Sequence, residues 1–289
     1  MNRWVKRGAQ ALLALALLAW TGGAAFVHFG QGRVIYLPTR EVTKTPRDLG
    51  LQYEELRLAV PAADGKKETI AAWWVPPDAL ADQQVKKAVL FLHGNSRNMG
   101  ATANLEKVAT LAREGFAVLT IDYRGFGASD GEQPSEARIY ADADAALDEF
   151  KRRVPDAQRR ILHGHSLGGA VAIDLAARRP EFAAVFIEAS FTSMLDMSTG
   201  NPLYRLLPID TLLTERFDSQ AKLARIGLPI LFIHGTADAR VPASMSLRLH
   251  EAARSPKALH IVDGAQHNNL HKLPQYAQAY RALLAMATR

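Results

Sequence analysis

The chain has 289 residues, of which 48% are hydrophobic and 22% are charged. This composition is typical of a globular protein with a large apolar core, and α/β folds of this length commonly form a single domain. The absence of cysteine excludes a disulfide, a thiol nucleophile and a thiolate metal site, and it leaves the cellular compartment open. The formal net charge is +6. Arg3, Lys6 and Arg7 supply three of these positive charges, and no nucleic-acid recognition motif accompanies the remaining basic residues. Nucleic acid is therefore not an expected partner.

The first thirty residues form a separate unit. Arg3, Lys6 and Arg7 precede residues 8–30, which contain no Asp, Glu, Lys or Arg. About 20 apolar helical residues cross a bilayer, and leading positive charge keeps the N-terminus in the cytoplasm. We therefore expect residues 1–30 to be a transmembrane anchor, with the following domain on the outer, periplasmic or extracytoplasmic, side. The alternative is a signal peptide cleaved near the small residues at 22–24, which would release the domain in secreted or periplasmic form.

Residues 31–289 are expected to form one α/β domain that begins with a linker-like stretch at 31–51. Short β-rich runs then alternate with helical stretches, which is typical of a mostly parallel sheet covered by helices. An antiparallel hairpin is expected at 52–60 and 68–75, and further strands at 88–92, 117–121, 160–163, 184–187, 230–233 and 259–262. Helices are expected at 101–113, 135–153, 167–178, 242–253 and 273–286. The exception is 191–228, a long insert between two strands that we interpret as a lid or cap.

The sequence Gly164-His165-Ser166-Leu167-Gly168 has the pattern G-x-S-x-G and lies between an expected strand and an expected helix. In this setting the glycines permit a turn that is too tight for a Cβ, and the turn holds the serine hydroxyl above the edge of the sheet. A serine that only caps a helix does not need flanking glycines. The pattern therefore predicts Ser166 as a nucleophile.

A serine hydroxyl becomes an effective nucleophile when a base takes its proton, so a carboxylate and then a histidine should follow along the chain. Asp238 follows the strand at 230–233 and His267 follows the last strand, which places both on loops at the carboxyl edge of the sheet. Asp263 is the rival acid and His271 the rival base. We predict that His267 is the general base and that Asp238 orients it.

Acyl transfer also needs two N–H groups that stabilise the oxyanion. The first usually comes from the residue after the nucleophile, which here is Leu167, and the second from the loop after an early central strand. Asn95 lies in that loop, so its backbone N–H is the second candidate. His260, His267 and His271 lack a carboxylate at a familiar ligand spacing, and we expect neither a metal nor a cofactor.

Taken together, these motifs resemble the α/β-hydrolase superfamily, and within it the membrane-anchored, serine-aminopeptidase-like branch of bud-emergence and abhydrolase-domain proteins. The matching motifs, which extend from about residue 35 to the C-terminus, are His93-Gly94-Asn95, Asp122-Tyr123-Arg124-Gly125-Phe126-Gly127-Ala128-Ser129, Gly164-His165-Ser166-Leu167-Gly168-Gly169, Ser190-Phe191-Thr192-Ser193, His234-Gly235-Thr236-Ala237-Asp238 with Val241-Pro242, and Gly264-Ala265-Gln266-His267-Asn268. The resemblance implies a Ser166, Asp238, His267 triad, an eight-stranded sheet with helices on both faces, a small cap, and hydrolysis of an ester or amide.

The cap carries apolar side chains, and Phe191, Leu195 and Met197 are candidates for binding substrate or for simple core packing. The expected substrate is a small acyl ester, a lipid or a peptide, and the sequence does not choose among them. Two alternatives stay open. One is an acyltransferase that uses the same triad, and the other is a catalytically silent, membrane-tethered binding protein.

Overall fold

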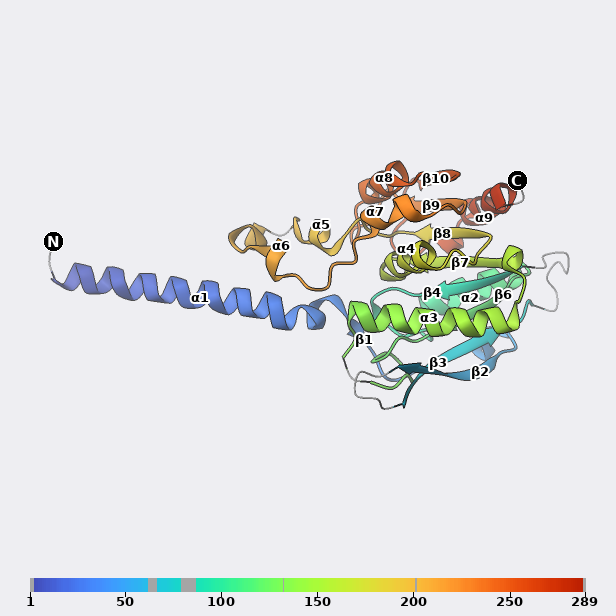
Figure 1. The fold of residues 1–289 in the computed structure, drawn as a ribbon, viewed down its shortest axis with the longest axis horizontal. Helices are drawn as coiled ribbons and strands as arrows, with labels where there is room; N and C mark the ends of the chain where they lie inside the picture. Colours follow the sequence, from blue (N-terminus) through green and yellow to red (C-terminus); the bar gives the residue numbers. More distant parts are fainter. Residues whose placement is uncertain (1–2, 62–66, 79–86, 132, 201, 288–289) are drawn as a thin grey trace.

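The computed structural model describes residues 3–61, 67–78, 87–131, 133–200 and 202–287, which contain one eight-stranded sheet and a separate two-stranded one (Figure 1). The large sheet comprises β2 (Glu54–Pro61), β3 (Lys67–Val75), β4 (Ala88–Leu92), β6 (Ala117–Ile121), β7 (Arg160–His165), β8 (Ala184–Glu188), β9 (Ile230–Gly235) and β10 (Lys257–Val262). Their order across the sheet is β10-β9-β8-β7-β4-β6-β3-β2. Neighbouring strands are parallel, except that β3 is antiparallel to β2 and β6. The expected mostly parallel sheet and its antiparallel hairpin are confirmed.

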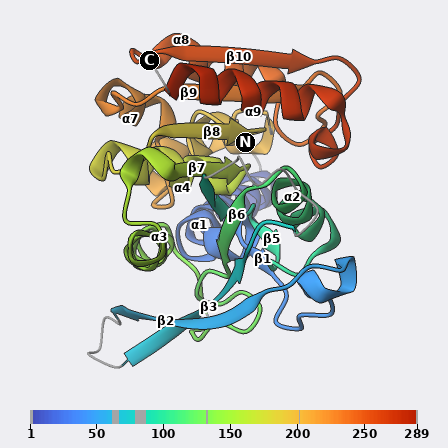
Figure 2. The same ribbon diagram turned by 90° about the vertical axis from the view of Figure 1, so that its right-hand side faces the viewer.

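Helices cover both faces of the sheet. The first face packs against α3 (Glu136–Arg153), α4 (Leu167–Arg178) and α8 (Ala243–Ala252), and the second against α2 (Thr102–Arg113) and α9 (Pro274–Ala287). Figure 2 shows α3 and α2 on opposite sides of the sheet. Within β4, Leu90 and Leu92 join the first core and Val89 and Phe91 the second. A strand buried on both faces has an uninterrupted apolar sequence, which is why these strands were predictable.

Helix α1 (Arg3–Ile35) has 33 residues and projects away from the sheet (Figure 1). Among the described residues it is the one helix long and apolar enough to cross a membrane. The linker-like interpretation of residues 31–51 is wrong, because α1 continues to Ile35 and the next residues pair with the domain. Strand β1 (Leu37–Pro38) lies parallel to β5 (Ser96–Arg97), and a 3₁₀ turn, η1 (Pro46–Leu49), follows. These contacts involve too few residues to produce a periodic pattern in the sequence.

The expected cap is a series of short helices between β8 and β9. It contains α5 (Met194–Ser198), η3 (Pro202–Leu206), α6 (Ile209–Leu212), α7 (Ser219–Lys222) and η4 (Leu223–Arg225). Figure 1 shows α5 and α6 extending from the sheet in the same direction as α1. Val27 of α1 packs with Ile209 and Leu213 in a small core of its own. The cap and the N-terminal helix therefore form one structural unit beside the domain.

Candidate active site

Ser166 occupies the turn between β7 and α4 and has φ 55° and ψ −119°. Positive φ is unfavourable for a residue with a side chain, so the surrounding structure must impose it. Two glycines make the turn possible. A Cβ on Gly164 would lie 2.1 Å from the carbonyl oxygen of Gly168, and a Cβ on Gly168 would lie 2.0 Å from that of Leu92. The close approach of β7, α4 and β4 therefore fixes the serine in this conformation.

The structure brings the two other predicted residues to the same edge of the sheet. His267 Nδ1 lies 2.7 Å from Asp238 Oδ2, and the Asp238 side chain is fully buried. Ser166 and His267 line the same two pockets, although no hydrogen bond joins them among the described residues. Such contacts are often long without substrate and shorten when it binds. The geometry therefore allows His267 to act on the Ser166 hydroxyl.

Asp238 is held by four hydrogen bonds. Besides His267, its carboxylate accepts from His234 Nε2 at 3.1 Å and from the backbone N–H groups of Arg240 and Val241 at 2.8 and 2.9 Å. Burial alone would raise the pKa of Asp238, but the hydrogen bonds from His234, His267 and Val241 outweigh it and hold this pKa well below its ordinary value. Asp238 is therefore an anion, as the partner of a catalytic imidazole must be.

The two rivals from the sequence lie in other contacts. Asp263 accepts a hydrogen bond from the Thr236 hydroxyl at 2.9 Å on the surface. His271 Nε2 pairs with Glu106 at 3.2 Å, and burial lowers the pKa of His271. No group of three His, Cys, Asp or Glu side chains that could hold a metal ion occurs among the described residues.

A second histidine, His165, contacts the backbone of His267. His165 Nε2 donates to the carbonyl oxygen of His267 at 3.0 Å, and burial lowers the pKa of His165 well below its ordinary value. A neutral imidazole can make this contact when its one proton is on Nε2. The residue between glycine and serine in the motif therefore fixes the backbone of His267.

Both candidate oxyanion donors lie at the site. Asn95 and Leu167 line the apolar pocket with Ser166, and neither backbone N–H donates to another backbone group in the described chain. Leu167 is the first residue of α4, where N–H groups lack partners within the helix. The Asn95 side chain donates to the carbonyl oxygen of Ile35 at 2.6 Å, which fixes its loop against the end of α1.

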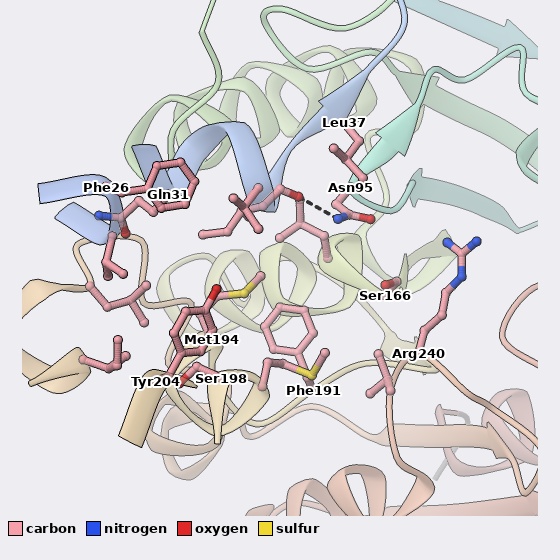
Figure 3. A pocket seen from close by; sticks show the side chains of 18 of the residues that line it. Phe26, Gln31, Leu37, Asn95, Ser166, Phe191, Met194, Ser198, Tyr204 and Arg240 are labelled. Carbon is pink, nitrogen blue, oxygen red and sulfur yellow. Dashed lines mark hydrogen bonds between the residues drawn. The ribbon is translucent and has the colours of Figure 1, made fainter. Parts of the chain in front are cut away.

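Ser166 lies between two cavities of different character. An apolar one of about 310 Å³ lies between α1, the cap and Ser166 (Figure 3). A polar one of about 330 Å³ lies on the other side and is lined by residues 94–97 and 101–104. Asn95, Ser166, Arg240 and His267 border both. The arrangement suits a substrate with an apolar part and a polar part joined near the serine.

Two of the three predicted substrate-binding residues, Phe191 and Met197, line the apolar cavity. Leu195 does not line it and packs instead beside Val27 in the small core between α1 and the cap. The sequence reasoning missed the contribution of α1, which supplies five lining residues. These are Phe26, Val27, Gln31, Val34 and Ile35. The sequence did not mark this face of the helix, because exposed residues such as Phe29 are as apolar as those that line the cavity.

Comparison with known proteins places the chain in a family. Residues 83–217, which include Ser166, match the family described as serine aminopeptidase, S33. An uncharacterized protein of Mycobacterium tuberculosis is 33% identical over 90% of this chain and 89% of its own. Alpha/beta hydrolase domain-containing protein 17B of Xenopus laevis is 33% identical over 69% of this chain and 67% of its own. Protein bem46 of Schizosaccharomyces pombe is 29% identical over 97% and 93% of the two chains.

Solved structures share the fold. An esterase of Pyrococcus furiosus superimposes with a TM-score of 0.65 at 20% identity, covering 88% of this chain and 97% of its own. The fold and the arrangement of the site define an α/β-hydrolase. Within that class, the chain belongs to the family of alpha/beta hydrolase domain-containing protein 17B, and it is similar to bem46 and, over residues 83–217, to the serine aminopeptidase family. Membership of this family supports hydrolase activity.

Proposed function

We propose that the protein is a serine hydrolase that cleaves an acyl ester or amide through an acyl-enzyme on Ser166. The backbone of Ser166 carries the proposal, because its φ of 55° places a non-glycine side chain in a strained conformation at the end of a central strand. Strain of this kind amounts to roughly 1–3 kcal/mol and is concentrated at functional sites. A helix cap alone would not require it.

In the proposed mechanism, Asp238 accepts a hydrogen bond from His267 Nδ1, which leaves Nε2 free to take the Ser166 proton. The serine oxygen attacks the acyl carbonyl, and the N–H groups of Asn95 and Leu167 stabilise the oxyanion. His267 then gives its proton to the leaving group. In the second half, His267 takes a proton from a water molecule, whose oxygen attacks the acyl carbon. His267 then returns this proton to the Ser166 oxygen as the bond to the acyl group breaks and the acid leaves.

An active-site probe tests this proposal directly. A fluorophosphonate reacts with an activated serine, so we expect the wild-type protein to be labelled and Ser166→Ala to lose both labelling and ester turnover. Ser244→Ala, which changes an exposed serine on α8, is the matched control and should retain both. Labelling that persists in Ser166→Ala would show that another residue is the nucleophile.

We also propose that residues 1–30 stay attached as a membrane anchor and that residues 31–289, with the cap at 191–228, form a catalytic domain on the outer side. The length and apolarity of α1 support this proposal, as do its contacts with the cap. Sequencing of the N-terminus of the mature protein and protease accessibility in sealed cells would test it. A mature chain that begins near residue 25 would establish a cleaved signal instead.

A further inference from the structure

Three polar side chains in the second half of α1, those of Trp20, His28 and Gln31, contact the backbone of the cap. Trp20 Nε1 donates to the carbonyl oxygen of Leu206 at 2.9 Å. Eight residues further along the helix, the His28 ring lies 3.1 Å from the carbonyl oxygen of Leu212. Membrane anchoring alone needs only apolar side chains in this part of the helix, so contacts between its polar groups and the cap need a further explanation.

Gln31 completes this set of contacts. Its Oε1 accepts hydrogen bonds at 2.9 Å from two cap N–H groups, those of Thr214 and Glu215, and its Nε2 donates to the carbonyl oxygen of Leu212. In a bilayer, a non-helical backbone is tolerated only where protein groups satisfy its N–H and C=O groups. The side chains of α1 do this for the part of the cap that lies beside the helix.

The contact between Trp20 and Leu206 sets the depth of the cap. Trp20 lies ten residues before Gly30, the last residue of the expected anchor, which is about 15 Å along the helix. The tip of the cap, held at the level of Trp20, therefore lies below the bilayer surface whenever the apolar residues after Trp20 are immersed. The exposed Arg205 beside Leu206 has a long side chain that can extend its charge toward the headgroups. Leu206 itself is 72% exposed.

The apolar cavity lies between these two elements. Figure 3 shows Phe26 and Gln31 of α1 on one side, Met194 and Tyr204 of the cap on another, and Ser166 at the far end. Its volume of about 310 Å³ is near the lower limit of roughly 300–1,000 Å³ for ligand sites. This space suits one hydrocarbon chain better than two. Most of its wall is apolar, so a chain gains free energy by entering it.

We propose that the tip of the cap is immersed in the membrane surface and that the apolar cavity is filled from the bilayer, by the single acyl chain of a membrane amphiphile. The chain enters between α1 and the cap, its carbonyl reaches Ser166, and its polar group occupies the polar cavity. This inference rests on the proposed serine hydrolase function and names its substrate class. It also explains why an anchor helix forms a wall of the site.

Two phenylalanines of α1 provide a matched test. Phe26 lines the cavity, whereas Phe29, three residues away, is 85% exposed and does not. The full-length protein is reconstituted in phosphatidylcholine vesicles and assayed with a hexadecanoyl lysophosphatidylcholine in the bilayer and with soluble p-nitrophenyl butyrate. We expect Phe26→Ala to lower the ratio of hexadecanoyl to butyrate turnover at least fivefold. Phe29→Ala should leave this ratio unchanged. If Phe26→Ala and Phe29→Ala gave the same turnover of hexadecanoyl and butyrate substrates, the proposal would be overturned.

A second measurement does not depend on turnover. The chain has no cysteine, so Leu206→Cys gives one labelling site at the tip of the cap. We expect a fluorophore at this site to be quenched by lipids that carry a nitroxide on the acyl chain, and a fluorophore on Leu247→Cys, an exposed position on α8, to be unaffected. An unquenched label at residue 206 would overturn immersion of the cap. Absence of fluorophosphonate labelling, in contrast, would contradict the hydrolase proposal. The quenching measurement would still test immersion of the cap, because it does not depend on activity.

Discussion

His234 Nε2 lies 3.1 Å from Asp238 Oδ2, the same oxygen that accepts the hydrogen bond of His267 Nδ1. The carboxylate is thus held between two imidazoles. The other ring nitrogen of His234 lies 2.6 Å from the Ser246 hydroxyl, and the ring is fully buried. His234 therefore acts as a support that is fixed at both ends and that sets the direction of the carboxylate toward His267.

Replacing His234 should impair catalysis more than substrate binding. A hydrogen bond to a charged group contributes about 1.5–3 kcal/mol, so we expect His234→Ala to lower kcat by about 10- to 100-fold with KM little changed. Steady-state kinetics on a soluble ester measure this split. Ser246→Ala, which loosens His234 but leaves it in place, should have a smaller effect. An unchanged kcat in His234→Ala would show that backbone N–H groups alone position Asp238.

The catalytic candidates were predictable from the sequence because local patterns and strand order determine them. Ser166 needs only the two glycines and the strand and helix around it, and Asp238 and His267 each follow a strand that ends at the same edge. The wall formed by α1 was not predictable. It depends on contacts between residues that are nearly 200 positions apart, such as Trp20 and Leu206. Apolar side chains lie on several faces of α1, so they do not reveal which face packs.

The helix bounds followed the sequence closely for the same reason. Expected and observed limits of α4 coincide, because its apolar face and the preceding glycine turn mark it clearly. The role of His234 was hidden, since a histidine at the end of a buried strand gives no sign of the carboxylate it will meet. Leu195, in contrast, was predicted to bind substrate and does not line the cavity. This apolar residue of the cap packs beside Val27 instead.

Asn95 links the end of α1 to the proposed oxyanion hole. Its side-chain amide donates to Ile35 and its carbonyl oxygen accepts from the Leu37 N–H at 2.9 Å. Removing the amide should leave the backbone N–H in place but less well oriented, so we expect Asn95→Ala to lower kcat by about tenfold, or 1.4 kcal/mol. Asn95→Asp is nearly isosteric but lacks the donor, and it should show the same loss. Full activity in Asn95→Asp would mean that the contact with Ile35 is dispensable.

A buried ion pair beneath the site should make stability depend on pH. Lys107 Nζ lies 3.2 Å from Glu188 Oε1, and both side chains are fully buried. Burial would raise the pKa of Glu188, but the charge of Lys107 and the hydrogen bond from His163 lower it well below its ordinary value. A depressed pKa stabilises the fold above the unfolded pKa of about 4.3. This stabilisation is lost as the pH falls through the folded pKa.

Lys107→Met should therefore destabilise the protein by about 3–5 kcal/mol at pH 7, because it leaves a buried carboxylate without its partner. The pKa of Glu188 then rises, so the deficit relative to wild type should shrink as the pH is lowered from 7 to 5. Urea unfolding followed by circular dichroism measures both values. The double variant Lys107→Met/Glu188→Gln, which removes both charges, should recover much of the loss. A deficit that does not vary with pH would show that Glu188 is not the group responsible.

The glycine turn around Ser166 makes a sharp prediction about packing. A Cβ at Gly168 would lie 2.0 Å from the Leu92 carbonyl oxygen and 2.6 Å from that of His93, both backbone atoms of the adjoining strand and loop. Backbone cannot rotate away as a side chain can, so we expect Gly168→Ala to destabilise the fold by at least about 3 kcal/mol, the upper part of the range for overpacking.

A Cβ at Gly227 would meet no atom within 4 Å. Gly227→Ala should therefore be neutral or stabilising by up to about 1 kcal/mol, since alanine restricts the unfolded chain. Urea unfolding gives the free energy of unfolding of both variants. The difference between them separates a general effect of glycine replacement from the effect of the close approach of α4 to β4. If Gly168→Ala proved as stable as Gly227→Ala, the tight packing that holds Ser166 at positive φ would not exist in solution.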